Sequence, residues 1–373
     1  MRTLIIGGGA AGLYLSTLVP YSIIVEKEPR CGRKLYMTGG GRCNFTHKAT
    51  VPELLPHYNG NLPFIRKVLY SHTPEDIIRH MESQGIRAIT EDDGRVFPET
   101  ELSESVIMAL MPETSRIIKG REAVSAVKNR GLFEVTLDDG QKLRTETLVI
   151  ATGCSAACFP PYNGSGYNLL SSFGHTITDR HPALAPLRLE RSISGAEGIT
   201  TGIRIKAGRK EAEGDAVITH NGISGPVVLN MSRNVLDGDE ITISFSDVDI
   251  KELRIREPKK LVRNAIDLPE RLIRTLIGNL ADKKIGNLSK DDERKIEENI
   301  TAFRTRAWPV KQQAMTEAGG AILSEFNPVT MESKLVPGLY AAGDVLDVDA
   351  DTGGYSLTWA FATAWCISRA VML

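Results

Sequence analysis

Apolar and polar positions along the 373-residue chain change their period several times. Residues 3–28, TLIIGGGAAGLYLSTLVPYSIIVEKE, predict a buried strand, a glycine turn, a short helix and a second buried strand. Both strands are apolar runs without alternation, as expected of parallel strands that are covered on two faces. The chain therefore opens with a βαβ unit of an α/β domain.

Helical periodicity dominates residues 50–112, followed by a change to a period of two. The helix TPEDIIRHMESQG has Thr73 as its predicted N-cap and Gly85 just past its end. From residue 115 to 150, strand-like runs are separated by the turn signals NRG and DDG. This pattern predicts an antiparallel meander that ends in the apolar strand TLVIATG.

The remaining chain divides into three parts. Residues 183–250 are strand-like, whereas residues 251–312 are charged and helical, including SKDDERKIEENITAFRTRAW. Strand character returns in GGAILSEFNP and PGLYAAGDV, before a final apolar helix that opens at a glycine pair. We predict an α/β domain formed by residues 1–182 and 313–373, interrupted by a β-rich domain (183–250) and a helical subdomain (251–312).

Composition and charge narrow the class of protein. The formal net charge is −1, so no general attraction to nucleic acid or to an acidic membrane is expected. The run KELRIREPKKLVR (251–263) carries six Lys or Arg against two Glu and is interpreted as a solvated helix face. Neither a signal peptide nor an apolar stretch of membrane-spanning length is recognised, which predicts a cytoplasmic protein.

The five cysteines form no CxxC pair, and no cluster typical of a zinc site or a Ser/His/Asp site is seen, so no metal is predicted. Cys154 and Cys158 are interpreted as buried small residues rather than as a redox pair. The sequence makes no prediction of the oligomeric state.

The glycine turn matches the pattern G-x-G-x-x-G. Gly7 suits a tight turn, Gly9 lets the backbone approach a pyrophosphate, and Gly12 allows close packing of helix and strand. Helix-start amides at Ala10 and Ala11 then face the phosphate charge. Glu26, at the end of the second strand, is placed to accept hydrogen bonds from ribose hydroxyls. Together these features predict an adenine dinucleotide.

FAD is favoured over NAD(P)H as the bound dinucleotide. A glycine loop, a meander, the tripeptide ATG at 151–153 and the late GLYAAGD at 338–344 replace the regular βα units of a simple dehydrogenase. An α/β fold brings such distant segments to one extended ligand. No second dinucleotide fingerprint follows, so NAD(P)H is expected only as a transient donor.

Several motifs resemble those of one flavoprotein family. GGGAAG, GRKLYMTGGGRCNFT, THNGISGP, TMESKLVPGLYAAGDVLDVD and GGYSLTWAFATAW are similar to the bacterial and archaeal NAD(FAD)-utilising dehydrogenases, which include aminoacetone oxidase and a bile-acid dehydroxylation reductase. The resemblance spans essentially the whole chain. It implies a Rossmann-like FAD-binding domain with a β-barrel-like insertion and a small helical subdomain.

The resemblance also implies which residues contact FAD. Arg33 corresponds to an arginine near the pyrophosphate or ribose, and Val124 to a backbone contact with adenine. Asp344 corresponds to the acid that bonds the ribityl hydroxyls. The final helix begins beneath the pyrimidine end of the flavin, where its amides stabilise negative charge. The other expected cofactor contacts are Lys27, Lys34, Thr38, Ala151, Thr152, Gly153, Gly343, Gly353, Gly354, Tyr355, Ser356 and Leu357.

The stretch TGGGRCN is the most specific of these motifs. Gly39, Gly40 and Gly41 are expected to let bare backbone pass close to the flavin, where a Cβ would collide. Arg42 and Asn44 are expected to bond the polar edge of the ring or a substrate, and Cys43 between them is counted among the cofactor contacts. Cys43 is open to two interpretations, a packed small residue or a redox-active thiol.

Catalytic residues are harder to assign from the sequence. His220 lies in the motif HNGISGP and is a candidate acid or base, although a structural histidine bonded to the adjacent turn is the favoured interpretation. Tyr355 is a second candidate that would line the substrate pocket.

We therefore predict a FAD-dependent oxidoreductase that transfers hydride between a small organic substrate and flavin N5. One alternative is an NAD(P)H-dependent reductase of an enone-like substrate. Another is a non-catalytic FAD-binding redox protein or an RNA-associated protein.

Overall fold

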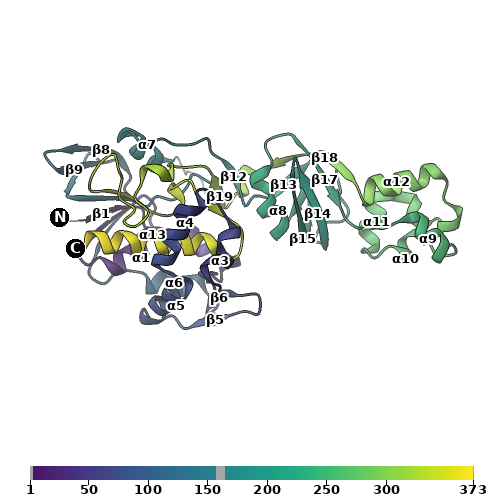
Figure 1. Ribbon diagram of the computed structural model, residues 1–373, viewed down its shortest axis with the longest axis horizontal. Coiled ribbons are helices and arrows are strands. Elements are labelled where there is room, and N and C mark those ends of the chain that lie inside the picture. Colours follow the sequence, from purple (N-terminus) through teal and green to yellow (C-terminus); the bar gives the residue numbers. More distant parts are fainter. Residues whose placement is uncertain (1–2, 157–163, 373) are drawn as a thin grey trace. The chain divides into compact units, whose positions relative to one another are not determined.

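The computed structural model describes residues 3–156 and 164–372, so Cys158 lies outside the described residues. These residues divide into two compact units, whose elements are labelled in Figure 1. The first unit holds the chain up to Ser155, residues 164–180, and everything from Glu317 onward. The second unit holds His181–Thr316 together with Ala156.

A five-stranded parallel sheet forms the centre of the first unit. Its strand order is β20-β11-β1-β2-β7, and every neighbouring pair is parallel. The strands are β1 (Thr3–Ile6), β2 (Ile23–Glu26), β7 (Arg116–Lys119), β11 (Thr147–Ile150) and β20 (Leu339–Ala341). All four residues of β1 are buried, as its continuous apolar run predicts. The carboxyl ends of these strands meet at one edge of the sheet.

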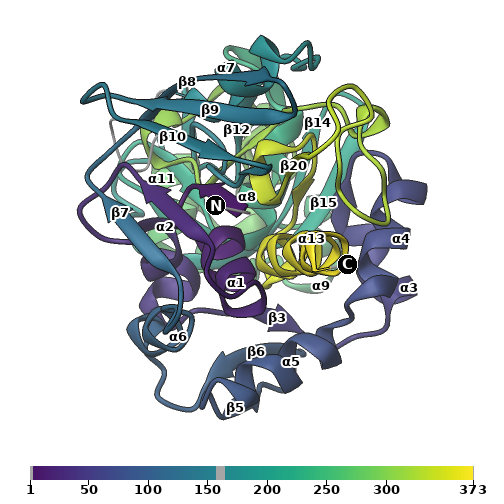
Figure 2. The same cartoon turned by 90° about the vertical axis from the view of Figure 1, so that its left-hand side faces the viewer.

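Two layers cover this sheet, as Figure 2 shows. On one side α1 (Ala10–Leu18) packs against α13 (Tyr355–Val371), the long C-terminal helix. On the other side lies an antiparallel meander of β8 (Ala123–Asn129), β9 (Leu132–Leu137) and β10 (Lys142–Thr145). The predicted turns NRG and DDG connect these strands, which confirms the meander. Helix α7 (Ser165–Ser172) contacts β8.

The segment between β2 and β7 supplies helices and two small sheets. Helix α5 (Pro74–Ser83) begins at the predicted N-cap Thr73, which exchanges hydrogen bonds with Asp76 in a capping box. One small sheet has the order β3-β6-β5, and the other pairs β4 with β21. The elements are α2 (Arg33–Met37), β3 (Thr46–His47), α3 (Val51–Leu54), β4 (Tyr58–Asn59), α4 (Leu62–Ser71), β5 (Ala88–Thr90), β6 (Arg95–Pro98), α6 (Ser103–Ala109) and β21 (Asp349–Ala350).

The second unit contains a closed antiparallel barrel with the order β13-β16-β15-β14-β17-β18. Its inward positions alternate with outward ones and form an aliphatic core that includes Ile205, Ile218 and Ile243. The strands are β13 (Leu187–Leu189), β14 (Thr200–Ala207), β15 (Lys210–Thr219), β16 (Gly222–Ser224), β17 (Asp239–Ser244) and β18 (Phe303–Pro309).

Helices lie between β17 and β18, and their buried side chains join the same hydrophobic cluster as the barrel. They are α9 (Ile250–Arg256), α10 (Val262–Ala265), α11 (Glu270–Ile277) and α12 (Lys290–Ile300), and α8 (Pro226–Met231) lies earlier, against β15. Helix α12 begins at its predicted cap Ser289.

The helical interpretation of residues 301–309 was wrong. FRTRAWP alternates buried and exposed residues and forms the last barrel strand, because its period is two. The predicted fold class is confirmed: a parallel α/β core, a barrel and a set of helices. Among the described residues, no helix combines the length and apolar character needed to cross a membrane.

Candidate functional site

The turn after β1 leaves no room for side chains at two of its glycines. At Gly7, with φ of +110°, a Cβ would lie 2.3 Å from the carbonyl oxygen of Ala151. At Gly12 it would lie 1.9 Å from the carbonyl oxygen of Gly7. At Gly9, by contrast, no described atom lies within 4 Å of a Cβ, and α1 starts there without a side-chain cap. The first turn of α1 therefore has no side-chain cap and has open space beside Gly9, which fits a pyrophosphate.

Glu26 is held at the carboxyl end of β2 by backbone N–H groups. Its carboxylate accepts hydrogen bonds from Gly8 N at 2.6 Å and from Glu28 N at 2.8 Å. Burial raises the pKa of Glu26 above its ordinary value, and these two N–H donors oppose that shift only in part. The neighbouring Lys27 is half-buried, and Arg33 donates to Glu28 at 2.8 Å. The carboxylate therefore sits beside the glycine turn, as adenosine ribose recognition requires.

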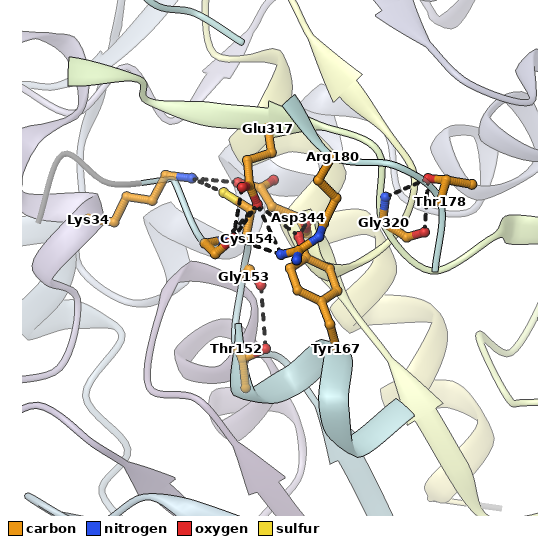
Figure 3. A network of polar contacts seen from close by, with 11 residues as sticks. Lys34, Thr152, Gly153, Cys154, Tyr167, Thr178, Arg180, Glu317, Gly320 and Asp344 are labelled. Carbon is orange, nitrogen blue, oxygen red and sulfur yellow. Dashed lines mark hydrogen bonds and ion pairs between the residues drawn. The ribbon is translucent and has the colours of Figure 1, made fainter. Parts of the chain in front are cut away.

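Lys34 and Asp344 meet at the carboxyl ends of the central strands (Figure 3). Lys34 Nζ donates to Asp344 Oδ2 at 2.8 Å and to Cys154 Sγ at 3.3 Å. Burial alone would lower the pKa of Lys34, but the negative charge of Asp344 outweighs it and holds that pKa well above its ordinary value. Two predicted cofactor residues are thus brought into contact, with Cys154 as a neighbour.

Around this pair lies a polar network that sequence reasoning missed (Figure 3). Glu317 accepts hydrogen bonds from Ser155 N and Ser155 Oγ, both at 2.8 Å. Tyr167 OH lies 3.4 Å from both Glu317 and the Asp344 carbonyl oxygen, and the Arg180 guanidinium lies 4.3 Å from the Tyr167 ring centre. These residues belong to separate segments without a shared motif, so no sequence signal connected them.

The stretch Ala151-Thr152-Gly153 continues from β11 toward this network. Gly153 has φ of +71°, and a Cβ there would meet no described atom within 4 Å. Thr152, in contrast, packs closely against Gly166 of α7. A Cβ on Gly166 would lie only 1.9 Å from the Thr152 hydroxyl oxygen. On the meander, Val124 lies at a register shift between β8 and β9. Its neighbours Ala123 and Ser125 pair with Leu137 and Thr136, and Val124 itself has no partner in β9. A backbone contact with adenine therefore stays a prediction that this geometry accommodates.

The glycine loop Thr38–Gly41 contains three residues with positive φ: Gly39, Gly40 and Gly41. A Cβ on Gly39 would lie 2.9 Å from the backbone nitrogen of Asn44. A Cβ on Gly40 or Gly41 would meet no described atom within 4 Å. Protein atoms therefore exclude a side chain at Gly39, whereas Gly40 and Gly41 border open space, and the expected close approach of the flavin stays a prediction.

Two of the three residues after the loop, Arg42 and Asn44, anchor it to β6. Arg42 forms ion pairs with Glu91 at 2.7 Å and Glu101 at 2.6 Å, with its guanidinium 4.0 Å from the Phe97 ring centre. Asn44 Oδ1 accepts a hydrogen bond from Val96 N at 3.2 Å. Both side chains therefore make protein contacts, and their expected bonds to a ring or substrate stay predictions.

Cys43 is fully buried, with φ of +62°. Burial raises the pKa of its thiol to about 12, so the thiolate form is strongly disfavoured. Of the two interpretations left open by the sequence, this geometry favours the packed residue.

The start of α13 lies against the segment that follows the glycine loop. Gly353 and Gly354 have φ of +130° and +93°, and a Cβ on Gly354 would lie 2.8 Å from Asn44 Oδ1. Tyr355, Ser356 and Leu357 form the first turn of the helix.

Trp359, one turn after the start of α13, donates from Nε1 to the carbonyl oxygen of Gly343 at 3.3 Å. Gly343 N in turn donates to Thr363 Oγ1 at 3.1 Å. Because Gly343 follows β20, these bonds place the start of α13 beside the carboxyl ends of the parallel strands. Ligands of open α/β sheets bind at this edge.

Tyr355 is packed between two histidines that sequence reasoning missed. The ring centres of His57 and His47 lie 4.4 Å and 5.0 Å from that of Tyr355, with interplanar angles of 13° and 20°. His57 Nδ1 also lies 3.1 Å from Asp351 Oδ2. Burial raises the pKa of Tyr355 to about 12, helped by the charges of Asp351 and Asp93. His47 ends the stretch GGGRCNFTH, so its presence in that motif was an available signal.

His220, the other predicted catalytic residue, belongs to the second unit. Its side chain is 85% exposed, and Nδ1 lies 4.0 Å from Glu197 Oε1. The structure places it on the barrel, in a unit separate from Tyr355, and its catalytic role stays a prediction. No group of three or more His, Cys, Asp or Glu able to hold a metal occurs in the described part of the chain.

Comparisons with known proteins agree with this architecture. The family model described as HI0933-like protein Rossmann domain matches residues 1–370. A ribosomal RNA dihydrouridine synthase of Escherichia coli is 29% identical over 391 residues, which cover 98% of this chain and 96% of the relative. A 3-dehydro-bile acid delta(4,6)-reductase of Clostridium scindens is 29% identical over 406 residues and 98% of both chains.

Among solved structures, the 3-ketosteroid delta1-dehydrogenase of Sterolibacterium denitrificans matches with a TM-score of 0.55. The identity is 12%, and the match covers 99% of each chain. At this identity the likeness concerns the fold alone.

Proposed function

Because the chain belongs to the HI0933-like Rossmann family and is a FAD-dependent oxidoreductase, we propose that it saturates a carbon–carbon double bond conjugated to a carbonyl. The observation that carries this proposal is the chemistry shared by the two named relatives. Dihydrouridine is uridine saturated at the ring double bond next to a carbonyl. The 4,6 double bonds of a 3-oxo bile acid are likewise conjugated to a ketone.

The residues at the strand ends fit FAD in this proposal. The free amides of α1 hold the pyrophosphate, Glu26 bonds the ribose of adenosine, and Asp344 bonds the ribityl chain. Bound FAD supplies hydride transfer to and from N5. The open backbone at Gly40 and Gly41 lets a planar ring approach, because no Cβ fills that space.

NAD(P)H is the proposed electron donor. Only one dinucleotide fingerprint occurs in the sequence, and the residues at the strand ends suit a single extended dinucleotide. The nicotinamide cofactor therefore docks transiently and leaves after reduction. An oxidase, which would pass electrons from a substrate to oxygen, is the rival enzyme.

Anaerobic stopped-flow spectroscopy separates these possibilities. Purified protein with bound FAD is mixed with NADH or NADPH, and loss of flavin absorbance is followed. The reduced protein is then mixed with a 3-oxo-4,6-diene steroid, with ribosomal RNA or with oxygen. We expect rapid reoxidation by a conjugated double bond and slow reoxidation by oxygen. Rapid flavin reduction by amines, with oxygen as the best acceptor, would overturn the proposal in favour of an oxidase.

RNA is a second candidate substrate, in which the double bond to be reduced belongs to a base. The outer face of the barrel favours this candidate. Arg188, Lys206, Arg304 and Arg306 are exposed on β13, β14 and β18. In the strand register, Thr242 of β17 pairs with both Lys206 and Arg304, so these two cations flank it.

Acids stand opposite two of the four cations in the strand register, Glu211 opposite Lys206 and Glu240 opposite Arg306, but at a distance longer than an ion pair. Within the described residues none has a carboxylate within 4.0 Å, whereas Arg204 on the same face pairs with Asp247 at 2.7 Å. The Arg188 guanidinium lies 4.1 Å from the ring centre of Trp308, which is half-buried. Unpaired cations beside an aromatic ring suit a phosphate backbone with unstacked bases. The near-zero net charge of the chain does not exclude such a local surface.

The RNA proposal is tested by binding of ribosomal RNA at several salt concentrations. We expect the double variant R304E/R306E to weaken binding at least about 10-fold and to flatten the salt dependence. The matched control R256E/R294E changes two arginines of the same unit that are paired with acids, and is expected to have a smaller effect. If the affinity for ribosomal RNA changed neither with salt concentration nor in R304E/R306E, RNA would be removed from the proposal.

A further inference from the structure

We propose that His57 is the proton donor of this site, delivering a proton from Nε2 to the substrate carbon next to the carbonyl. The inference rests on the proposed reduction of a conjugated double bond. It assigns the step to a histidine of the first unit in place of Tyr355.

His57 is held rigidly by its neighbours. It ends a short 3-10 helix, Leu55–His57, and its carbonyl oxygen accepts a hydrogen bond from Asp351 N at 2.9 Å. The Asp351 carboxylate lies 3.1 Å from Nδ1, and the imidazole stacks on Tyr355 with a centre distance of 4.4 Å. A carboxylate can only accept, so Nδ1 carries a proton in this contact and Nε2 is the exchanging nitrogen.

Nε2 of His57 is open. The side chain is 40% exposed, and no hydrogen-bond partner for Nε2 occurs among the described residues. A carboxylate that fixes one imidazole nitrogen while the other stays free is the arrangement used for acid–base transfer.

The other histidines of the first unit differ from His57 in this respect. His175 is also bound to a carboxylate, Glu325, but its Nε2 is occupied by Ser333 at 2.8 Å. His47 Nδ1 contacts the carbonyl oxygen of Gly353 at 3.2 Å rather than an acid. His72 and His80 bond the hydroxyls of Tyr14 and Thr17. Within this unit, all of whose histidines lie in the described residues, only His57 combines an acid on one nitrogen with a free second nitrogen.

The position of His57 fits the ligand edge of the sheet. Its stacking partner Tyr355 begins α13, and Trp359, four residues later, bonds the residue that follows β20. One helical turn advances about 5.4 Å, so the backbone of Tyr355 lies about one turn before that of Trp359. His57 thus stands where a substrate stacked beside the dinucleotide would be reached.

The surrounding charges favour His57 over Tyr355 as donor. The titratable groups around this stack are Asp351, Tyr355, His47, Tyr58 and, acting on Tyr355, Asp93. With its pKa raised to about 12, the Tyr355 phenol is a weak acid at neutral pH. An imidazole with one nitrogen held by a carboxylate and the other free is a common general acid. Tyr355 is therefore a positioning residue that orients the imidazole.

The proposed step balances in atoms and electrons. Saturation adds one hydride and one proton across the double bond. The hydride, with both electrons, comes from reduced FAD, which the nicotinamide cofactor has reduced beforehand. The proton leaves Nε2–H of the imidazolium as the new carbon–hydrogen bond forms. Neutral imidazole remains and takes a proton from water.

The two half-reactions test the proposal. In H57Q we expect unchanged FAD content and unchanged flavin reduction by NAD(P)H, with reoxidation by the conjugated substrate slowed about 100-fold. In H57A, added imidazole should restore part of the rate, because the position is accessible. The control H80Q alters a histidine bonded to Thr17 and should match the wild type. Reoxidation of H57Q at the wild-type rate would overturn the proposal.

A second measurement does not depend on turnover. Nitrogen-15 NMR of the imidazoles in the oxidised protein should show His57 protonated on Nδ1 when neutral, and D351N should abolish this preference. An Nε2–H tautomer that D351N leaves unchanged would overturn the role of His57. If no conjugated double bond reoxidises the wild-type protein, the proposed function fails, and the NMR result still decides whether the dyad exists.

Discussion

The Lys34 ammonium lies 2.8 Å from the Asp344 carboxylate, although the two residues are 310 positions apart in the sequence. Lys34 belongs to α2, after the opening βαβ unit, and Asp344 follows β20 at the far side of the sheet order. The contact therefore exists only because the late strand returns to the parallel sheet beside β11. It fixes a carboxylate at the edge where the proposed FAD site lies.

Asp344→Ala is expected to weaken FAD retention without unfolding the protein. Loss of a charged hydrogen-bond acceptor costs about 1.5–3 kcal/mol, which corresponds to at least a 10-fold rise in the FAD dissociation constant. Lys34 keeps 28% exposure, so water can solvate it in the variant. Fluorescence titration of the apoprotein measures the change. Asp237→Ala, which removes an acid paired with Lys311 in the other unit, is the control. Undiminished affinity in D344A would remove Asp344 from the site.

Gly12→Ala and Gly9→Ala should separate folding from cofactor binding. In G12A the new methyl group would overlap the carbonyl oxygen of Gly7, so we expect a loss of about 1–3 kcal/mol in unfolding free energy. In G9A it meets no described atom, so the apoprotein should keep its stability while FAD affinity falls. Urea unfolding and flavin titration measure the two effects. Full FAD affinity in G9A would place the pyrophosphate elsewhere.

Cys43 should resist alkylation in the folded protein. With its pKa raised to about 12, roughly one thiol in 10⁴ is ionised at pH 8, and the side chain is fully buried. Peptide mapping after iodoacetamide treatment should find Cys43 modified only after unfolding. C43S should retain FAD and turnover. A C43S variant that binds FAD but has lost flavin reduction would instead indicate a redox-active thiol.

Stability should fall as the pH drops from neutral to about 5, in part because of His72. Burial lowers its pKa from 6.5 to about 4, so the folded protein holds it neutral, bonded to Tyr14 OH at 2.6 Å. Between these two pKa values the unfolded chain binds more protons than the folded protein. The stabilisation by neutral His72 is therefore present above pH 6.5 and is lost as the pH falls toward 4.

Through His72, the free energy of unfolding is expected to fall by about 2 kcal/mol between pH 7 and pH 5. Urea unfolding at both pH values measures it. H72Q removes the titration and keeps a side chain able to bond Tyr14, so its stability should change less over this range. Equal losses in the wild type and H72Q would show that other groups dominate.

Local pattern was sufficient for much of the fold. The apolar run of β1, the glycines after it and the N-cap at Thr73 act over a few residues, so their structure follows from sequence alone. The meander was predictable for the same reason, because its strands are adjacent in the chain and their turns carry glycine. The motif G-x-G-x-x-G followed by Glu26 likewise predicted a dinucleotide site, since the turn, the helix start and the acid lie within one βαβ unit.

Other features depended on contacts between distant segments. FRTRAWP was assigned to a helix because it follows the charged helix α12, and only its pairing with β13 and β17 makes it a strand. The stack of His57 on Tyr355 joins residues that are 298 positions apart in the sequence, and no spacing rule links them. The pairing of Arg42 with Glu91 and Glu101 also joins separate segments and has no sequence signal, while its predicted contact with the ring or a substrate stays a prediction.

The sequence by itself thus determined the α/β class and the glycine cradle, because backbone conformation and burial follow from nearby residues. Only the tertiary structure decided which side chains share the edge of the sheet. The reason is physical: the pairing of β20 with β11, and of α13 with α1, sets where Asp344, Tyr355 and His57 lie. Once these long-range contacts form, Lys34 meets Asp344 after β20, and His57 stacks on Tyr355 at the start of α13.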